Sequence, residues 1–543
     1  MKIYISILIL SFLLTGQKAS SQPDKTTIYL HASKSYNDKD YLNAAKLFDQ
    51  INSFSLSQGR LYQGACIYAL NNETGKAFEL LNFLADKKYY SNYEHLSTDT
   101  DLTNLHHDPK WMLLLGMVKH NSSTVAQRKL ATIYSELTKA KQLLAKDNGK
   151  LWGSPIWNDD IFVLDYDNTI YAIKAFPGSS TDNGKLFYAH VPANTFVFVN
   201  TVQSYQGKEY ATVLSNYLYD NSVTVIHELF HLLQLKNIKL NGDAIKYLDH
   251  YDARELLRLE YQALRNTLNA VNSKSTAATT KLYLEDALLF RKLRQNKYKA
   301  FLDQELQIET LEGLANYTGF ALSTSANKYE SAIEEIYQRE NSETYTRPFP
   351  YATGVAYGLI FDHLKMKWKK GLKEVYNFLA IYEKHKVIST SEMMVVAAKG
   401  RSNYEHIHQE EEIRHTKNEI LLRYYQDLLL VKPTLKVKIG ENYGRTFNMN
   451  GTIEIPGTGT VYSSITGKDK SGRNFGNFTT KADKASLGTA GVLMLNDAKT
   501  FIFPTPFKIE GNKIVGETYE IDLNDGWNVQ KTDEIGNYVI RQK

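Results

Sequence analysis

The chain has 543 residues, a formal net charge of +5 and a hydrophobic content of 43%. This length predicts roughly two to four domains, and the composition is sufficient for a sizeable apolar core. Acidic and basic residues are mixed along the chain without a Lys/Arg block, which argues against a nucleic-acid partner. Because Cys66 is the only cysteine, an internal disulfide and a Cys-rich zinc site are both excluded.

Residues 1–21 have the layout of a secretory signal peptide. Lys2 precedes an apolar run, residues 3–14, and small polar residues follow up to a cleavage position after Ser21. The run is too short to span a bilayer comfortably, and the rest of the chain has no apolar stretch of membrane length. We therefore expect an exported protein, periplasmic or secreted, with no stable membrane span after cleavage. An uncleaved short anchor is the alternative.

Residues 22–118 are predicted to form helical hairpins. Ala44 and Ala77 are 33 positions apart in segments of similar character, and such small residues permit close helix contact. This spacing is near the roughly 34-residue period of tetratricopeptide repeats, which the hairpins loosely resemble. A plain helical cap is the alternative to a peptide-binding repeat.

A small sheet is predicted to follow an amphipathic helix at residues 124–146. Short β-branched or aromatic runs are separated there by Asn, Asp, Gly and Pro, which is typical of strands and turns. The predicted strands cover residues 161–164, 170–173, 186–189 and 195–199.

The residues after the predicted sheet carry the most specific motif of the chain. His227-Glu228-Leu229-Phe230-His231 is an HExxH sequence within a predicted helix, residues 222–235. Side chains four residues apart lie one above the other on a helix, so both imidazoles can bind one metal ion. Glu228 then lies beside the metal, placed to take a proton from a water molecule that the metal activates.

A catalytic zinc ion takes three protein ligands and keeps one position open, so a third ligand is needed. The best candidate is Glu312, within the sequence Glu-Thr-Leu-Glu-Gly-Leu-Ala-Asn-Tyr at residues 309–317. Glu309 lies one turn earlier on the same predicted face, and is the alternative ligand or a partner of the ligand. His250 beside Asp249 is a further alternative.

These motifs resemble those of the gluzincin zinc metallopeptidases, such as thermolysin and the aminopeptidases related to leukotriene A4 hydrolase. The resemblance consists of HExxH, the Glu-Gly-Leu-Ala-x-Tyr element that begins at Glu312, and Pro-Tyr-Ala-Thr-Gly at residues 350–354. It implies a thermolysin-like catalytic domain, bound Zn²⁺, Glu312 as the third ligand, and a peptide or protein substrate. It also implies that Tyr351 donates a hydrogen bond to the oxyanion of the tetrahedral intermediate. Because the chain has 37 tyrosines, Tyr317 is a rival for this role.

The chain departs from this family in two places. Glu312 follows His231 by 81 residues, much farther than in those peptidases, and the intervening sequence predicts an inserted helical pair at about residues 240–300. The Gly-x-Met-Glu-Asn element that binds the substrate amine in the aminopeptidases is missing upstream of His227. Aminopeptidase specificity is therefore not implied.

Helices are predicted up to about residue 430. Within them, residues 405–415 are dense in His and Glu, but charges occur at every spacing, which favours a solvated helix face over a metal site. After Pro433 the sequence alternates and becomes rich in Gly, Thr, Val and Ile, as at residues 452–455 and 459–462. A compact β domain is therefore predicted for the C-terminal region.

Together these patterns predict a multi-domain protein that is mainly α. Helical hairpins lie at its N-terminus, a small sheet belongs to the thermolysin-like metallopeptidase domain, and a β domain ends the chain. Residues 195–201 are the expected sheet edge for pairing with an extended peptide. The predicted boundaries are 1–21, 22–118, 119–432 and 433–543.

The expected function is that of an exported zinc metallopeptidase. His227, His231 and Glu312 are its predicted metal ligands, and Glu228 and Tyr351 are its predicted catalytic residues. The alternative is a non-catalytic peptide- or glycan-binding protein of the cell envelope with a vestigial or structural zinc site. A structural site is closed by a fourth protein ligand, whereas a catalytic site stays open.

Overall fold

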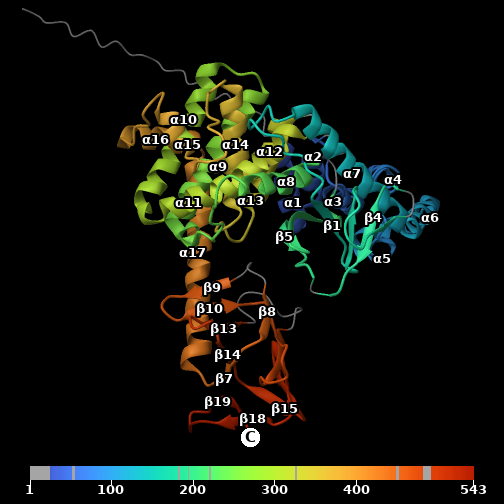
Figure 1. Cartoon of the computed structure of the whole chain (residues 1–543), viewed down its shortest axis with the longest axis vertical. Coiled ribbons are helices and arrows are strands. Elements are labelled where there is room, and N and C mark those ends of the chain that lie inside the picture. Colours follow the sequence, from blue (N-terminus) through green and yellow to red (C-terminus); the bar gives the residue numbers. More distant parts are fainter. Residues whose placement is uncertain are drawn as a thin grey trace, which may run out of the picture. The chain divides into compact units, whose positions relative to one another are not determined.

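A computed structural model of the chain describes residues 25–51, 56–181, 184–193, 195–218, 222–323, 327–447, 452–480 and 491–543 (Figure 1). The predicted signal peptide, residues 1–21, lies outside these described residues. The chain divides into two compact units, residues 1–131 and 132–543. No helix in the described part of the chain is long and apolar enough to cross a membrane.

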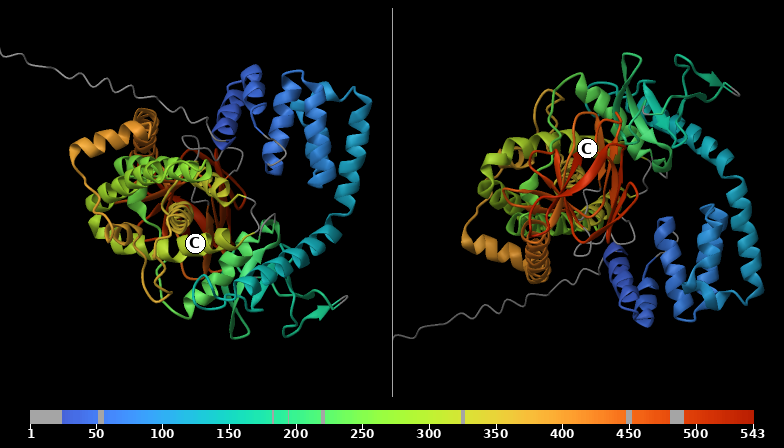
Figure 2. Two further views of the ribbon diagram at one scale, coloured as in Figure 1. Left: turned by 90° about the horizontal axis from the view of Figure 1, so that it is seen from above. Right: turned by 90° about the horizontal axis from the view of Figure 1, so that it is seen from below.

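The first unit is built from helices that pair with their neighbours along the chain, as the N-terminal sequence predicts. α1 packs against α2 and α3 against α4, and Figure 2 shows these helices side by side in blue. Ala44 and Ala77 are fully buried in its core, and a Cβ on Gly64 would lie 2.2 Å from the Phe48 ring. The elements are α1 (Lys25–Asn37), α2 (Tyr41–Phe48), α3 (Gln58–Leu70), α4 (Thr74–Lys87), α5 (Tyr93–Thr98), the 3-10 helix η2 (Thr100–Leu105) and α6 (Pro109–Ser123).

Helix α7 (Val125–Asp147) spans the boundary between the units, and a six-stranded sheet follows it. The strand order is β3-β4-β2-β1-β6-β5. β1 and β6 pair in parallel, and the other neighbours are antiparallel. Three of the four predicted strands are found, as β1, β2 and β4. The strands are β1 (Ile161–Leu164), β2 (Thr169–Ala172), β3 (Ser180–Thr181), β4 (Phe187–His190), β5 (Thr201–Tyr205) and β6 (Lys208–Leu214).

The strand predicted at residues 195–199 is wrong, because the edge strand β5 begins only at Thr201. Gln203 explains the difference. Its side-chain amide accepts a 2.8 Å hydrogen bond from the Val197 N–H and donates one of 2.9 Å to the Val197 carbonyl oxygen. A side chain, rather than a neighbouring strand, therefore pairs with the backbone of Val197, in the middle of this segment. The predicted sheet edge, residues 195–201, is corrected to β5.

Helices α8 to α16 form the middle of the second unit. The inserted pair predicted at about residues 240–300 corresponds to α9 and α10, which pack along each other, and α9 also packs against α13 and α14 (Figure 1). The elements are α8 (Val223–Leu235), η4 (Lys246–Asp249), α9 (Tyr251–Asn272), α10 (Ala277–Lys297), η5 (Lys299–Phe301), α11 (Leu302–Ile308), the π-helical turn η6 (Glu309–Gly313), α12 (Leu314–Leu322), α13 (Lys328–Glu340), α14 (Phe349–His363), α15 (Phe378–Glu383) and α16 (Glu392–Arg401).

Helix α17 (Tyr404–Gln426) is joined to α9 by ion pairs. The Glu411 side chain is only 2% exposed and lies 3.3 Å from Arg254 and 3.2 Å from Arg258. Most of residues 405–415 are exposed, in agreement with the predicted solvated helix face, whereas Ile407 and Glu411 are buried on the other side of the helix. A carboxylate can be buried there because arginines on the facing helix neutralise it.

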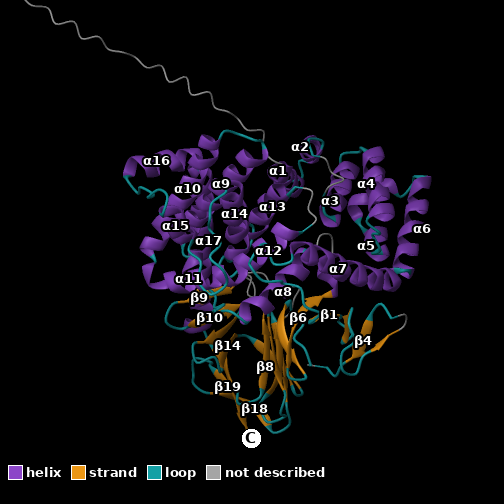
Figure 3. Cartoon of the chain, turned by 45° about the horizontal axis from the view of Figure 1, so that its top comes forward, coloured by secondary structure: helices purple, strands orange, loops and turns teal. Residues whose placement is uncertain are grey.

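The C-terminal region is rich in strands, as the sequence predicts (Figure 3). Its strands form two sheets, and buried side chains of both sheets pack in one core. The strand orders are β18-β19-β7-β14-β13-β10-β9 and β15-β16-β17-β12-β11-β8. Tyr425 of α17 packs with Val461 on the seven-stranded sheet. The elements are the π-helical turn η7 (Asp427–Val431), β7 (Thr434–Lys438), β8 (Tyr443–Phe447), β9 (Thr452–Ile455), β10 (Gly459–Tyr462), β11 (Ile465–Asp469), β12 (Gly476–Thr480), β13 (Val492–Leu495), β14 (Thr500–Pro504), β15 (Phe507–Glu510), β16 (Lys513–Gly516), β17 (Tyr519–Leu523), β18 (Trp527–Lys531) and β19 (Tyr538–Gln542).

Candidate metal centre

Helix α8 carries the HExxH motif in the interior of the second unit. His227, Glu228 and His231 are buried. The helix begins after Ser222, whose backbone is left-handed with a φ of 62°. The Ser222 hydroxyl donates a 3.0 Å hydrogen bond to the Glu136 carboxylate of α7. A left-handed backbone is unfavourable for a residue other than glycine, so its surroundings must hold it in place. The buried hydrogen bond to Glu136 does this for Ser222 and thereby helps to fix where the motif helix starts.

Glu312 comes from the π-helical turn η6, between α11 and α12. Such turns are rare and occur frequently at functional sites. α12 packs closely on α8, because Gly319 has no side chain: a Cβ there would lie 2.7 Å from the Val223 carbonyl oxygen. This close approach brings the turn that carries Glu312 to the motif helix.

The ligand atoms of the three predicted metal ligands converge. The Nε2 atoms of His227 and His231 are 3.0 Å apart. Glu312 Oε2 lies 3.4 Å from the first of them and 3.5 Å from the second. Zinc bonds of about 2.0–2.1 Å in a tetrahedral arrangement separate ligand atoms by about 3.4 Å. The three side chains therefore fit a zinc ion.

Glu309, the alternative third ligand, is occupied by other partners. Its two oxygens accept hydrogen bonds of 2.6 and 2.7 Å from the Arg291 guanidinium, and the Thr353 hydroxyl also donates to it. The Arg291 and Glu309 side chains are completely buried. The geometry therefore favours Glu312 as the ligand and leaves Glu309 as an anchor of the same turn.

Asp249 and His250 also have other partners. Asp249 accepts a 2.8 Å hydrogen bond from the Tyr345 N–H and lies 3.3 Å from Arg254. His250 precedes the first residue of α9, and its Nδ1 atom lies 3.5 Å from the Tyr298 hydroxyl. These contacts give both residues a structural role at the start of the inserted helical pair.

Glu228 lies beside the ligands but is not the nearest carboxylate. Its Oε1 atom is 3.9 Å from His227 Nε2, farther than Glu312 Oε2. Its Oε2 atom is buried and has no hydrogen-bond partner among the described residues. Burial raises the pKa of Glu228, the nearby histidines oppose this effect, and Glu312 adds to it. A buried carboxylate with an unused oxygen is suited to proton transfer with a molecule bound beside it.

The electrostatic surroundings of His231 and Glu312 favour a positive charge beside them. Burial alone would lower the pKa of His231, but hydrogen bonding to Glu312 and the charge of that carboxylate raise it to about 9. Burial alone would raise the pKa of Glu312, but hydrogen bonds from His227 and His231 hold it well below its usual range. A bound divalent cation would supply the charge that this donor set attracts.

Tyr351 is brought to the same place by a contact between two glycines. A Cβ on Gly354 of α14 would lie 2.3 Å from the Gly313 Cα atom, so α14 can approach η6 only without a side chain there. The Tyr351 hydroxyl donates a 2.7 Å hydrogen bond to Glu312 Oε2, and its ring stacks on His227 with centroids 5.6 Å apart. Burial and the Glu312 charge raise the pKa of Tyr351, so its hydroxyl keeps the proton and remains a donor.

Tyr317, the rival tyrosine, points elsewhere. Its hydroxyl donates to Asp362, and its ring packs edge-on against Trp152 and Trp368. The structure therefore brings together His227, Glu228, His231, Glu312 and Tyr351, and separates Tyr317 from this group.

Gln234 is a residue of the site that sequence reasoning did not single out. Its Oε1 atom lies 2.8 Å from His231 Nδ1, and its Nε2 atom donates a 2.9 Å hydrogen bond to the Thr310 carbonyl oxygen. A hydrogen bond at Nδ1 orients the imidazole and leaves Nε2 for a metal. The sequence spacing could have predicted this contact, because a residue three positions after His231 lies on the same helix face.

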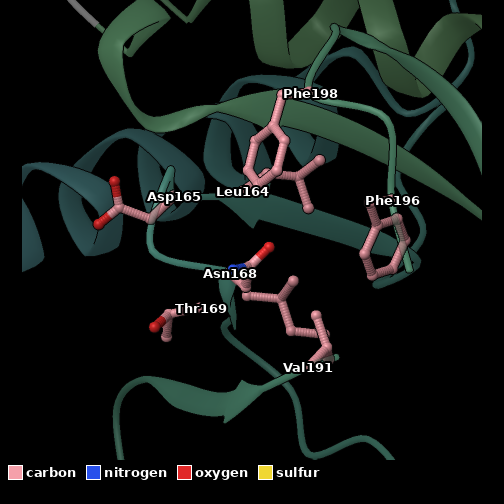
Figure 4. Close-up of a pocket in the computed structure, with 8 residues that line it drawn as sticks. Leu164, Asp165, Asn168, Thr169, Val191, Phe196 and Phe198 are labelled. Carbon is pink, nitrogen blue, oxygen red and sulfur yellow. The ribbon is translucent and has the colours of Figure 1, made fainter. Parts of the chain in front are cut away.

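A small pocket in the sheet formed by β1 to β6 does not include any of these residues. Figure 4 shows its lining side chains, which come from the ends of β1 and β2 and from the loop before β5. None of the metal-centre residues lines it, so we assign it no part in the site. The lining residues are Leu164, Asp165, Asn168, Thr169, Ile170, Val191, Phe196 and Phe198.

No protein-family model, curated protein or solved structure matches the chain. Function must therefore be inferred from the chemistry of the residues themselves.

Proposed function

We propose that this protein is an exported zinc-dependent metallopeptidase. The single observation that carries the proposal is the convergence of the His227, His231 and Glu312 ligand atoms within 3.5 Å of one another, beside a Glu228 carboxylate whose Oε2 atom has no hydrogen-bond partner among the described residues. This donor set is one that catalytic zinc uses, with three protein ligands and an open position. Export is proposed from residues 1–21 alone, whose sequence is typical of a signal peptide.

Zinc, when bound, polarises a scissile carbonyl group and acidifies a water molecule. Glu228 is the general base, because its free and buried oxygen can accept a proton from the attacking water and return it to the leaving amine. Tyr351 is the proposed donor to the developing oxyanion, since its hydroxyl is protonated and lies within 2.7 Å of a metal ligand.

A peptide is the proposed substrate because an open sheet edge lies near the motif helix. β5 is the last strand of its sheet, and it packs against α8. The backbone N–H and C=O groups on the free side of an edge strand can pair with an extended peptide. This arrangement would place a peptide backbone alongside the helix that carries Glu228.

Cleavage of a mixed peptide library, followed by mass spectrometry, tests the proposal. The zinc-loaded wild type is compared with Glu228→Gln and with Glu392→Gln, which makes the same change at an exposed position. We expect products from the wild type and from Glu392→Gln. Peptide cleavage by Glu228→Gln should be about 10²–10⁴ times slower. Zinc content, measured by elemental analysis, should be equal in all three proteins.

Two outcomes would contradict the proposal. Equal turnover by Glu228→Gln would remove that residue from the general-base role. Absence of products from a zinc-loaded wild type would favour a non-catalytic binding protein of the cell envelope instead. The ends of the products would show whether the enzyme trims termini or cuts internally.

A further inference from the structure

A second cluster of charged residues is completely buried next to the metal centre. It joins α9, α10, α11 and the π-helical turn η6, and all five charged side chains in it have 0% exposure. Its members are Glu260, Arg291, Arg294, Glu305 and Glu309.

The two arginines of this cluster share Glu260 as a partner, but each also contacts a carboxylate that the other does not contact. Glu260 bridges them, at 2.7 Å from Arg291 Nε and 2.8 Å from Arg294 Nη2. The remaining nitrogens of Arg291 form a bidentate pair with Glu309 of η6. Arg294 Nη1 donates a 2.7 Å hydrogen bond to Glu305 of α11, and Arg294 Nε has no partner among the described residues. Only Arg291 therefore contacts the turn that carries Glu312.

This buried cluster is better explained by the side-chain positions that it fixes than by a gain in folding free energy. Taking five charges out of water is unfavourable, and well-packed apolar side chains often stabilise a core as well or better. A planar guanidinium that makes two parallel hydrogen bonds with one carboxylate does, however, fix both the distance and the orientation of its partner. The Arg291–Glu309 pair thus fixes one end of a five-residue turn.

That turn is anchored from a second side as well. The Thr353 hydroxyl donates to Glu309, and Thr353 lies on α14 two residues after Tyr351. Glu309 is three residues before Glu312, so its position constrains the backbone from which the Glu312 side chain projects. The segments that carry Glu312 and Tyr351 therefore meet at one fixed carboxylate.

We propose that Arg291 is a positioning residue of the metal centre. Through Glu309 it fixes the π-helical turn, so that Glu312 is held against His227 and His231. The inserted helical pair α9–α10, which lengthens the spacing between the second histidine and the third ligand, supplies this anchor. The inference rests on the proposed function, because it assumes that the three residues bind zinc.

The test compares Arg291→Lys with Arg294→Lys in the full chain. Both changes keep one positive charge, remove one guanidinium and affect the same buried cluster on the same helix. The readouts are zinc affinity by chelator competition, the absorption spectrum of the Co²⁺-substituted protein, and the melting temperature. We expect similar drops in melting temperature for both variants. Arg291→Lys alone should lower zinc affinity about 10–100-fold and alter the Co²⁺ spectrum, as expected when a ligand's supporting partner is lost.

Thr353→Val is a milder variant in case Arg291→Lys does not fold. It removes one hydroxyl that donates to Glu309 and keeps the volume of the side chain. Zinc affinity should fall in the same direction but by less, and the Co²⁺ spectrum should shift in the same sense. If Arg291→Lys does not fold and Thr353→Val binds zinc like the wild type, the proposal is overturned.

Other results separate the inference from the proposed function. Wild-type zinc affinity in a folded Arg291→Lys overturns the positioning role and leaves the metallopeptidase proposal intact. Equal losses of affinity in Arg291→Lys and Arg294→Lys would show general destabilisation and also overturn it. Failure of the wild type itself to bind zinc overturns both.

Discussion

Two carboxylates three residues apart, the completely buried Glu309 and the partly buried Glu312, have opposite surroundings. Glu309 forms a bidentate pair with Arg291, so a protein cation neutralises it in the interior. Glu312 lies against the two imidazoles of His227 and His231 and accepts a hydrogen bond from a tyrosine. The imidazoles beside Glu312 are groups that can bind a metal ion. The guanidinium beside Glu309 instead supplies the positive charge that a metal ion would supply.

This difference separates a structural charge cluster from the proposed metal centre. In the Arg–Glu cluster two arginines face three carboxylates, and side-chain hydroxyl groups of the chain donate further hydrogen bonds to these carboxylates. At the proposed metal centre the imidazole and carboxylate atoms converge without a lysine or arginine among them, and Glu228 Oε2 has no hydrogen-bond partner among the described residues. Buried polar atoms without a partner are found at binding and catalytic sites, but Arg294 Nε in the Arg–Glu cluster is such an atom too, so the convergence of the three side chains carries the distinction.

The largest expected effects come from exchanging either carboxylate for an amide. Glu312→Gln should lower zinc affinity by at least about 10³-fold, well beyond the 10–100-fold loss typical of residues that only support a ligand. Glu309→Gln should instead lower the free energy of unfolding of the metal-free protein by about 3–5 kcal/mol, because it leaves Arg291 poorly paired in the interior. Chelator competition measures the affinity, and urea unfolding in the presence of a chelator measures the stability.

The comparison fails if the two variants behave alike. Equal losses of metal-free stability would show that Glu312 is also a structural charge. Undiminished zinc binding by Glu312→Gln would show that Glu228, at 3.9 Å from His227 Nε2, or another group is the third ligand.

Local sequence spacing could predict the part of the metal centre that lies on one helix. His227 and His231 are four residues apart, and helical geometry alone makes their imidazoles neighbours. The same kind of reasoning predicted β1 with its observed bounds and identified the strand-rich C-terminal region, because periodicity and turn residues are local signals.

Contacts between distant segments could not be predicted in this way. The Arg291–Glu309 pair and the Gly313–Gly354 contact depend on how helices cross, and no spacing in the chain encodes the crossing. The strand wrongly predicted at residues 195–199 has a different, local origin. Its residues suit a strand, but the Gln203 side chain, six positions from Val197, pairs with the Val197 backbone N–H and C=O groups.

Tyr351→Phe tests the catalytic role of the hydroxyl that contacts Glu312. Loss of the hydroxyl should lower kcat about 10²–10³-fold, as for other oxyanion donors, with little change in KM. Tyr317→Phe is the matched control, because that hydroxyl is also buried against a carboxylate but lies away from the ligands. Steady-state kinetics on a peptide identified in the library would decide. A loss of kcat in Tyr317→Phe with none in Tyr351→Phe would reverse the assignment.

The smallest predicted effect concerns Gln234, which connects His231 to the π-helical turn. Gln234→Met keeps the side-chain volume but removes the acceptor for His231 Nδ1 and the donor to the Thr310 carbonyl oxygen. Zinc affinity should fall by about tenfold, the lower end of the range for such partners. Gln295→Met is the control, since Gln295 is equally buried but donates to Glu305 of the Arg–Glu cluster. Zinc titration should leave Gln295→Met within about twofold of the wild type. If both variants lose affinity equally, the two clusters do not act separately, and the distinction between Glu309 and Glu312 is one of degree.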